Sequence, residues 1–226
     1  MMRRHFEEVE EELKGRLLSM GSLVEEMIHS SIQGLAERRQ ELLAAVAERE
    51  ERVNRLHIEV DDACVKLIAL HQPAAADLRF IIAAIKINSD LERMGDQALN
   101  IAQTARRLLE QPQLEKRLVD IPRMADLAKG MVKDSLDAFV RKDTELARAV
   151  IGRDDAEDRL KSESFHELMH LMQSDASTIE RALSLILVAR NLERIADHAT
   201  NIAEDVIFMV EGKDIRHHAE EKAGGR

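Results

Sequence analysis

The sequence predicts an all-α fold of two tandem three-helix bundles produced by an internal duplication. Three observations lead to this prediction. The chain holds 9 Gly, 3 Pro and 5 Phe in 226 residues, with no Tyr or Trp, so the turns and aromatic strands of a β protein are missing. Apolar residues make up 45% and charged residues 34%, which suits helices with one buried and one charged face. Finally, the second half of the sequence resembles the first.

Proline residues and capping signals divide the chain into six helices. Pro73 separates the second helix from the third, and Pro122 marks the start of the fourth, which Asp120 is placed to cap. Ser177 and Glu180 have the S-x-x-E spacing of a capping box at the start of the last helix. We therefore expect helices over residues 5–37, 40–70, 75–109, 121–141, 144–173 and 177–211.

The repeat is visible as similarity at a nearly constant offset. Residues 23–50 align with residues 127–154 at an offset of 104. DLERMGDQALNIA, from residue 90, and NLERIADHATNIA, from residue 191, share eight of thirteen residues at an offset of 101. A three-residue difference in a loop accounts for the two offsets. We expect the first bundle to span residues 1–112 and the second, with a short charged tail, to span residues 113–226.

The third predicted helix carries one continuous apolar stripe at spacings of three and four residues, which is typical of a bundle core and not of a cofactor site. Its members are Phe80, Ala84, Ile87, Leu91, Met94, Ala98, Ile101 and Ala105.

Charge and composition exclude several classes of function. The 43 Asp and Glu outnumber the 33 Lys and Arg, giving a net charge of -10 and no basic patch for nucleic acid. The same charge argues against direct binding of free phosphate, because the sequence reveals no helix-terminus or arginine site to receive the anion. The longest apolar run, at residues 182–189, is far shorter than the roughly 18 residues of a membrane span. The single Cys64 suits a reducing compartment, so we expect a cytoplasmic protein without membrane insertion.

The repeated segment carries polar residues four positions apart, which places them on one side of a helix. They are Glu92, Asp96 and Asn100 in the first copy, and Glu193, Asp197 and Asn201 in the second. Ile85 and Ile186 lie seven residues earlier, so the acids continue a second apolar face. Carboxylates on such a face need a cation, a proton or a hydrogen bond, and oxygen ligands without thiolates favour Fe, Mn, Mg or Ca. The alternative is a solvated face in which Arg93 and Arg194 supply local ion pairs.

Two other functions remain open at this stage. Glu-x-x-His pairs end at His29, His166 and His170, as in ferritin-like di-metal enzymes, but they lack the two-fold arrangement of such a site. A metal-free helical adaptor is the second alternative. Because no nucleophile constellation or glycine-rich phosphate loop is present, we assign no catalytic residues and expect no enzyme.

Several segments resemble the PhoU family of phosphate-signalling regulators. They are LERMGD and LERIAD in the two copies, VDDACVKLIALHQPAAADLR at residues 60–79, SLDAFVRKDTELA at residues 135–147 and VEGKDIRH at residues 210–217. The resemblance runs over nearly the whole chain, from about His5 to His217.

The resemblance implies a helical protein that binds a multinuclear metal cluster, with iron or zinc as the expected metal, through Glu/Asp-x-x-x-Asp motifs. These motifs fall on Glu92 with Asp96 and on Glu193 with Asp197, while Asn100 and Asn201 are added by helical spacing. It also implies a negative regulator of the phosphate-starvation response that links a phosphate ABC transporter to a sensor histidine kinase. Such a protein would be cytoplasmic, or peripheral at the inner membrane through its partners. Apolar residues expected at the surface, such as Phe208, would also allow a homodimer.

Overall fold

The computed structural model describes residues 2–73, 75–112 and 120–215, and within these ranges it contains helices and no strand. The all-α prediction is therefore confirmed. The helices are α1 (Met2–Glu37), α2 (Gln40–His71), α3 (Ala76–Leu109), α4 (Ile121–Arg141), α5 (Thr144–Ile151), α6 (Asp154–Ser174), the 3₁₀ helix η1 (Ala176–Thr178) and α7 (Ile179–Glu211). None of the described helices is long and apolar enough to cross a membrane.

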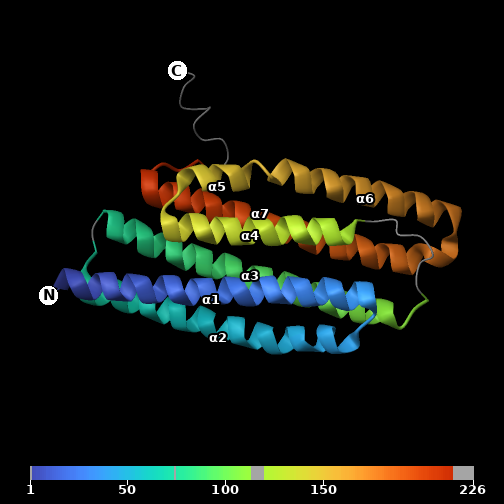
Figure 1. Cartoon of the computed structure of the whole chain (residues 1–226), viewed down its shortest axis with the longest axis horizontal. Helices are drawn as coiled ribbons and strands as arrows, with labels where there is room; N and C mark the ends of the chain where they lie inside the picture. Colours follow the sequence, from blue (N-terminus) through green and yellow to red (C-terminus); the bar gives the residue numbers. More distant parts are fainter. Residues whose placement is uncertain (1, 74, 113–119, 216–226) are drawn as a thin grey trace, which may run out of the picture.

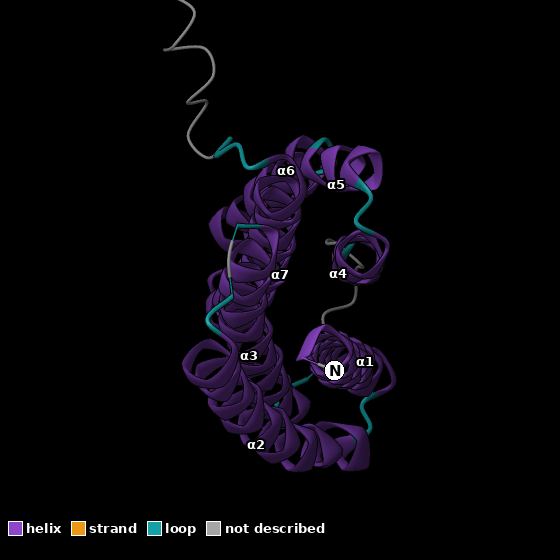
Figure 2. Ribbon diagram, turned by 90° about the vertical axis from the view of Figure 1, so that its left-hand side faces the viewer, coloured by secondary structure: helices purple, strands orange, loops and turns teal. Residues whose placement is uncertain are grey.

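The two bundles lie side by side with their long helices roughly aligned (Figure 1). Seen along the helices in Figure 2, α2, α3, α7 and α6 form one curved layer, and α1, α4 and α5 lie on its inner side. At the centre of the layer α3 and α7 run antiparallel. Lys86 Nζ of α3 lies 2.6 Å from Asp205 Oδ1 of α7, and Asp90 Oδ1 lies 2.8 Å from His198 Nδ1. The third helices of the two copies thus meet in the middle of the molecule.

The described core is continuous across both copies. Every residue of the apolar stripe predicted on α3 is buried, from Phe80 to Ala105. The Phe80 ring stacks on Phe139 of α4 with centroids 5.6 Å apart, so the first copy packs directly against the second. Gly21 of α1 lies against Leu136 of α4, where a Cβ would stand 2.1 Å from Leu136 Cδ1. The absence of a side chain at Gly21 therefore allows α1 and α4 to approach closely.

The predicted helix over residues 144–173 is wrong in one respect, because it is broken into α5 and α6 at Gly152 and Arg153. Arg153 N donates to Val150 O in a tight turn, and three acids, Asp154, Asp155 and Glu157, then occupy the first turn of α6. Negative charge is favoured at a helix N-terminus, so this acidic run starts a new helix after the glycine.

Two predicted caps also differ from the structure. The Ser177–Glu180 capping box does not form, because Asp175 caps this end instead and its Oδ1 accepts from Ser177 N at 2.9 Å. Asp120 does occupy the N-cap position of α4, but its side chain makes no capping hydrogen bond. Its backbone carbonyl accepts from Met124 N at 3.1 Å. The helix ends are thus close to prediction, while the groups that satisfy them differ.

Candidate metal centre

The two predicted oxygen ladders lie on α3 and α7 as expected, but their members differ in burial. Glu92, Asp96 and Glu193 are half-buried, whereas Asp197, Asn100 and Asn201 are exposed. Asn201 Nδ2 is 3.5 Å from Asp90 Oδ1, which turns this amide toward α3. Three of the four ladder carboxylates are therefore more buried than the asparagines.

In the second copy, Glu193 and Asp197 belong to a larger acidic cluster at the contact of α6 and α7. Glu157 of α6 lies at its centre with 1% of its surface exposed, and neither carboxylate oxygen has a hydrogen-bond partner among the described residues. Burial first, and then repulsion from Glu193, Asp158, Asp154 and Asp197, raise the pKa of Glu157 to about 8. We call these five residues the α6–α7 acidic cluster.

The same two effects act on other members of this cluster. Asp197 is exposed toward a surface pocket, yet its other side faces the cluster, and burial followed by repulsion from Glu193 raises its pKa to about 6. Burial and then repulsion from Asp158 also raise the pKa of Asp154. Carboxylates this close together repel one another when they are ionised. A nearby positive charge would therefore stabilise their ionised forms.

Lys161 of α6 supplies part of this charge. Its Nζ lies 2.8 Å from Asp158 Oδ1 and 2.6 Å from Glu193 Oε1. Hydrogen bonds to Asp158 and Glu193 raise the pKa of the Lys161 ammonium, so it stays charged. Lys161 therefore neutralises the outer carboxylates of the cluster, while Glu157 remains without a hydrogen-bond partner.

The equivalent place in the first copy is less acidic. At the offset of 104, Val53 corresponds to Glu157, Asn54 to Asp158 and His57 to Lys161. Asn88 of α3 donates to His57 O and Asp61 Oδ1, both at 2.9 Å, so this face of α3 meets α2. Among the described residues, Glu92 and Asp96 make no hydrogen bond or ion pair. The duplication has thus produced two related but chemically different acidic sites.

The donors of the α6–α7 acidic cluster fit a hard cation, because they are all carboxylates and one is buried without a partner. Glu157, Glu193 and Asp197 are the residues that would hold it, with Asp154 and Asp158 beside them. In the described ranges, no three His, Cys, Asp or Glu side chains already stand close enough together to hold a metal ion. The carboxylates would therefore have to move inward, and Lys161 would have to leave Glu193.

Other candidates from the sequence are not brought together. His29, His166 and His170 are all exposed, on α1 and α6. This arrangement offers no support for a ferritin-like pair of metal ligands. Phe208 is half-buried beneath Lys86, whose Nζ lies 5.7 Å from the ring centroid. This side chain is therefore covered by its own chain and is not a free apolar contact.

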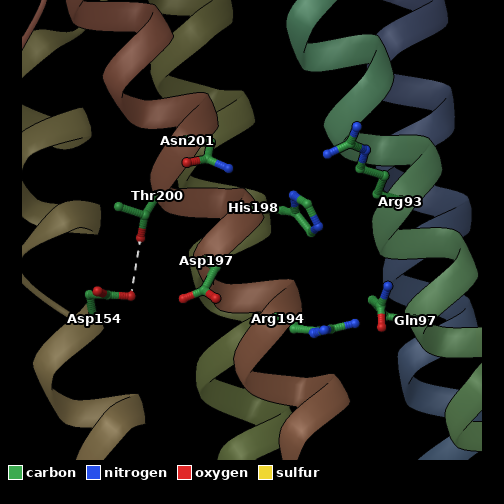
Figure 3. Close-up of a pocket in the computed structure, with 8 residues that line it drawn as sticks. All are labelled: Arg93, Gln97, Asp154, Arg194, Asp197, His198, Thr200 and Asn201. Carbon is green, nitrogen blue, oxygen red and sulfur yellow. Dashed lines mark hydrogen bonds between the residues drawn. The ribbon is translucent and has the colours of Figure 1, made fainter. Parts of the chain in front are cut away.

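A second feature is a pocket of about 800 Å³ beside the cluster, lined by residues of α3, α6 and α7 (Figure 3). Asp154, Asp197 and Thr200 line its acidic side, where Thr200 Oγ1 lies 3.5 Å from Asp154 Oδ1. Its other side is basic and amidic, lined by Arg93, Gln97, Arg194, His198 and Asn201. Reasoning from the sequence missed both this pocket and Glu157. The replacement of Val53 by an acid in the second copy is the signal that could have revealed Glu157.

The fold and these acidic faces define a duplicated all-α protein with two helical repeats. Comparison with known proteins places it more narrowly. The PhoU domain model matches the chain twice, over residues 17–105 and 121–206, and the chain belongs to the PhoU family.

Relatives and solved structures agree with this assignment. The phosphate-specific transport system accessory protein PhoU homolog of Pseudomonas putida is 42% identical over 92% of this chain and 81% of its own length. The Aquifex aeolicus homolog is 43% identical over 94% of this chain and 96% of its own length. The crystal structure of PhoU from Pseudomonas aeruginosa superposes with a TM-score of 0.89 at 38% identity, over 92% of this chain and all of that one. The phosphate transport system regulatory protein PhoU from Streptococcus pneumoniae superposes with a TM-score of 0.84 at 27% identity, covering 92% and 98% of the two chains.

Proposed function

We propose that this protein is a metal-binding negative regulator of the phosphate-starvation response. In this role it links a phosphate ABC transporter to a sensor histidine kinase, from the cytoplasm or at the inner membrane through its partners. It acts by binding these proteins and not as an enzyme. The relatives named as accessory or regulatory proteins of phosphate transport support the pathway. A ferritin-like oxidase has less support, because His29 is exposed on α1 and His166 and His170 are exposed on α6, and no three His, Cys, Asp or Glu side chains of the described residues stand close enough to hold a metal ion.

The buried carboxyl of Glu157 is the observation that carries the metal part of the proposal. A carboxylate without any partner costs several kcal/mol to bury, and four other acids surround this one. A divalent or trivalent cation would neutralise Glu157, Glu193 and Asp197 together and would hold α6 against α7. The bound metal thus supplies charge neutralisation and a cross-link between helices. Iron and zinc are the metals we expect, and more than one ion is accommodated by the number of carboxylates.

The first copy would hold metal more weakly. Glu92 and Asp96 have no partner among the described residues, but a valine replaces the central acid of the second copy. Fewer carboxylates give less charge to attract the cation. We therefore expect the two sites to fill in order, with Glu193 and Asp197 first.

Metal binding is tested by elemental analysis of protein equilibrated with Fe²⁺ or Zn²⁺ and then desalted. The wild type is compared with a Glu193→Ala, Asp197→Ala variant and a Glu92→Ala, Asp96→Ala variant. Glu163→Ala is the matched control, because it removes an exposed acid from α6 outside the cluster. We expect the first variant to lose more metal than the second and the control to lose none. Metal at background level in all four proteins would favour the metal-free adaptor, and equal bound metal in all four would contradict binding at these motifs.

The regulatory role is tested by a pull-down with the transporter ATPase subunit and with the cytoplasmic part of the kinase. Both should be retained by the metal-loaded wild type. We expect the variant lacking all four motif carboxylates to bind at least one partner more weakly, since the metal orders the α6–α7 face. Unchanged binding would remove the metal from the mechanism, and absence of binding to either partner would contradict the linking role.

A further inference from the structure

The pocket on the α3–α7 surface is lined by equivalent residues of the two copies. At the offset of 101, Arg93 corresponds to Arg194, and Gln97 corresponds to His198. Because α3 and α7 run antiparallel, these residues approach the same opening from opposite directions (Figure 3). The duplication has therefore placed two arginines at one pocket. Because they are about a hundred positions apart, the sequence alone does not reveal this.

Neither arginine is committed to another interaction. Arg93 and Arg194 are exposed, and neither makes a hydrogen bond or ion pair with any described residue. Other arginines of this protein are paired: Arg49 pairs with Glu26 at 2.9 Å and Arg153 with Asp134 at 2.6 Å. A guanidinium group presents a planar set of donors that matches the oxygens of phosphate and carboxylate. Two such groups at one pocket are suited to an oxyanion.

The remaining groups of the pocket specify which oxyanion fits. Gln97 Oε1 is buried and has no hydrogen-bond donor among the described residues. Asp197 adds a carboxylate on the other side of the pocket, and His198 Nδ1 is already engaged 2.8 Å from Asp90 Oδ1. The pocket thus combines two strong donors with one buried, unsatisfied acceptor, Gln97 Oε1. Hydrogen phosphate offers acceptor oxygens and a P–OH donor, whereas sulfate at neutral pH has only acceptors and would face Gln97 Oε1 unfavourably.

We propose that the pocket between α3 and α7 binds a protonated phosphate group, with Arg93 and Arg194 donating to its oxygens and Gln97 Oε1 accepting from its P–OH. The ligand is inorganic phosphate, because a phosphomonoester, with a second pKa of about 6, has mostly lost its P–OH at pH 7 and lacks this donor. The sequence alone argues against binding of free phosphate, because no arginine site is visible in it. The pocket provides such a site, with two arginines. The proposal goes beyond the regulatory role and does not depend on a bound metal.

The test is equilibrium dialysis or titration calorimetry with the metal-free full-length protein at constant ionic strength and pH 7. Inorganic phosphate, AMP and sulfate are the three probes. Arg93→Gln and Arg194→Gln each remove one charged donor, and Arg106→Gln is the control because Arg106 is an exposed arginine of α3 that does not line the pocket. We expect phosphate to bind saturably, about tenfold or more weaker in each pocket variant and unchanged in the control.

Specificity provides a second, independent readout. Sulfate should bind about tenfold or more weakly than phosphate to the wild type, because it cannot donate to Gln97 Oε1. Gln97→Met removes this acceptor and should bring the two affinities together. AMP is mostly a dianion without a P–OH at pH 7, so it should also bind more weakly than phosphate, and AMP binding as tight as that of phosphate would overturn the P–OH contact. Absence of saturable phosphate binding, or equal loss in the Arg106 control, would overturn the site; an unaltered preference for phosphate over sulfate in Gln97→Met would overturn the role of Gln97. Since the protein is free of metal, each of these outcomes leaves the metal proposal untouched.

Discussion

Replacing Glu157 by valine, the residue at the equivalent position of the first copy, should stabilise the metal-free protein. The folded protein holds the pKa of Glu157 at about 8, against an ordinary value of 4.5. The folded state therefore binds this proton more tightly than the unfolded state does. Stability contributed by the protonated group is complete below pH 4.5 and is lost progressively as the pH rises toward 8. Valine removes the group that causes this loss.

The pKa shift sets the size of the effect. Full ionisation of Glu157 above pH 8 costs at most about 5 kcal/mol of the free energy of unfolding, at about 1.4 kcal/mol per pKa unit. The same relation gives a cost of about 3 kcal/mol at pH 7 and about 1 kcal/mol at pH 5. Little solvent screening reduces these values, because the side chain is 1% exposed. Valine is smaller than glutamate, so a small cavity will offset part of the gain at every pH.

Urea unfolding, followed by circular dichroism at 222 nm between pH 5 and pH 9 with a metal chelator, measures the effect. The free energy of unfolding of Glu157→Val should exceed that of the wild type by an amount that grows with pH. Glu163→Gln, which neutralises an exposed acid of the same helix, should show no such trend. A gain that is independent of pH, or a loss at pH 8, would refute the interpretation of Glu157 as a buried acid without a partner.

Three other predictions concern packing, charge and reactivity. Gly21→Ala should destabilise the protein by about 1–2 kcal/mol in urea unfolding, because the added methyl group overlaps Leu136. Gly15→Ala is the control: its methyl group meets nothing within 4 Å, so it should stabilise the protein by about 1 kcal/mol. Lys86→Met should lower the free energy of unfolding by about 3 kcal/mol in the same assay, since it removes the ammonium that pairs with the buried carboxylate of Asp205. A change below about 0.5 kcal/mol would contradict this. Burial, followed by repulsion from a nearby aspartate, raises the pKa of the Cys64 thiol to about 12. A disulfide reagent at pH 8 should therefore modify Cys64 only after unfolding. Rapid labelling of the native protein would disprove this.

The general architecture could be predicted from the sequence because it depends on local patterns. The spacing of apolar residues determines which face of each helix is buried, and the stripe from Phe80 to Ala105 is buried throughout. The repeat predicted two equivalent bundles in the same way. The break at Gly152 was harder to predict, since an isolated glycine is tolerated within many helices. Here the acids that follow it make a new helix start more favourable than continuation.

The sites could be predicted only in part. Spacing identified Glu193 and Asp197, but the central position of Glu157 depends on how α6 packs against α7. Likewise, the sequence suggests Arg93 and Arg194 only as local ion-pair partners in the alternative of a solvated face, whereas both line a pocket where α3 and α7 meet. Contacts between helices distant in sequence carry this information, and helical periodicity alone does not contain it.

The antiparallel meeting of α3 and α7 also explains why the copies were able to diverge. If a single copy existed alone, this face could be covered only by a second identical chain turned around, as in an isologous dimer. Every substitution there would appear twice and would have to suit both partners. Joining the copies in one chain removes that constraint, so each half can specialise. Gln97 and His198 occupy equivalent positions on this face of the two copies, and their difference is a mark of this freedom.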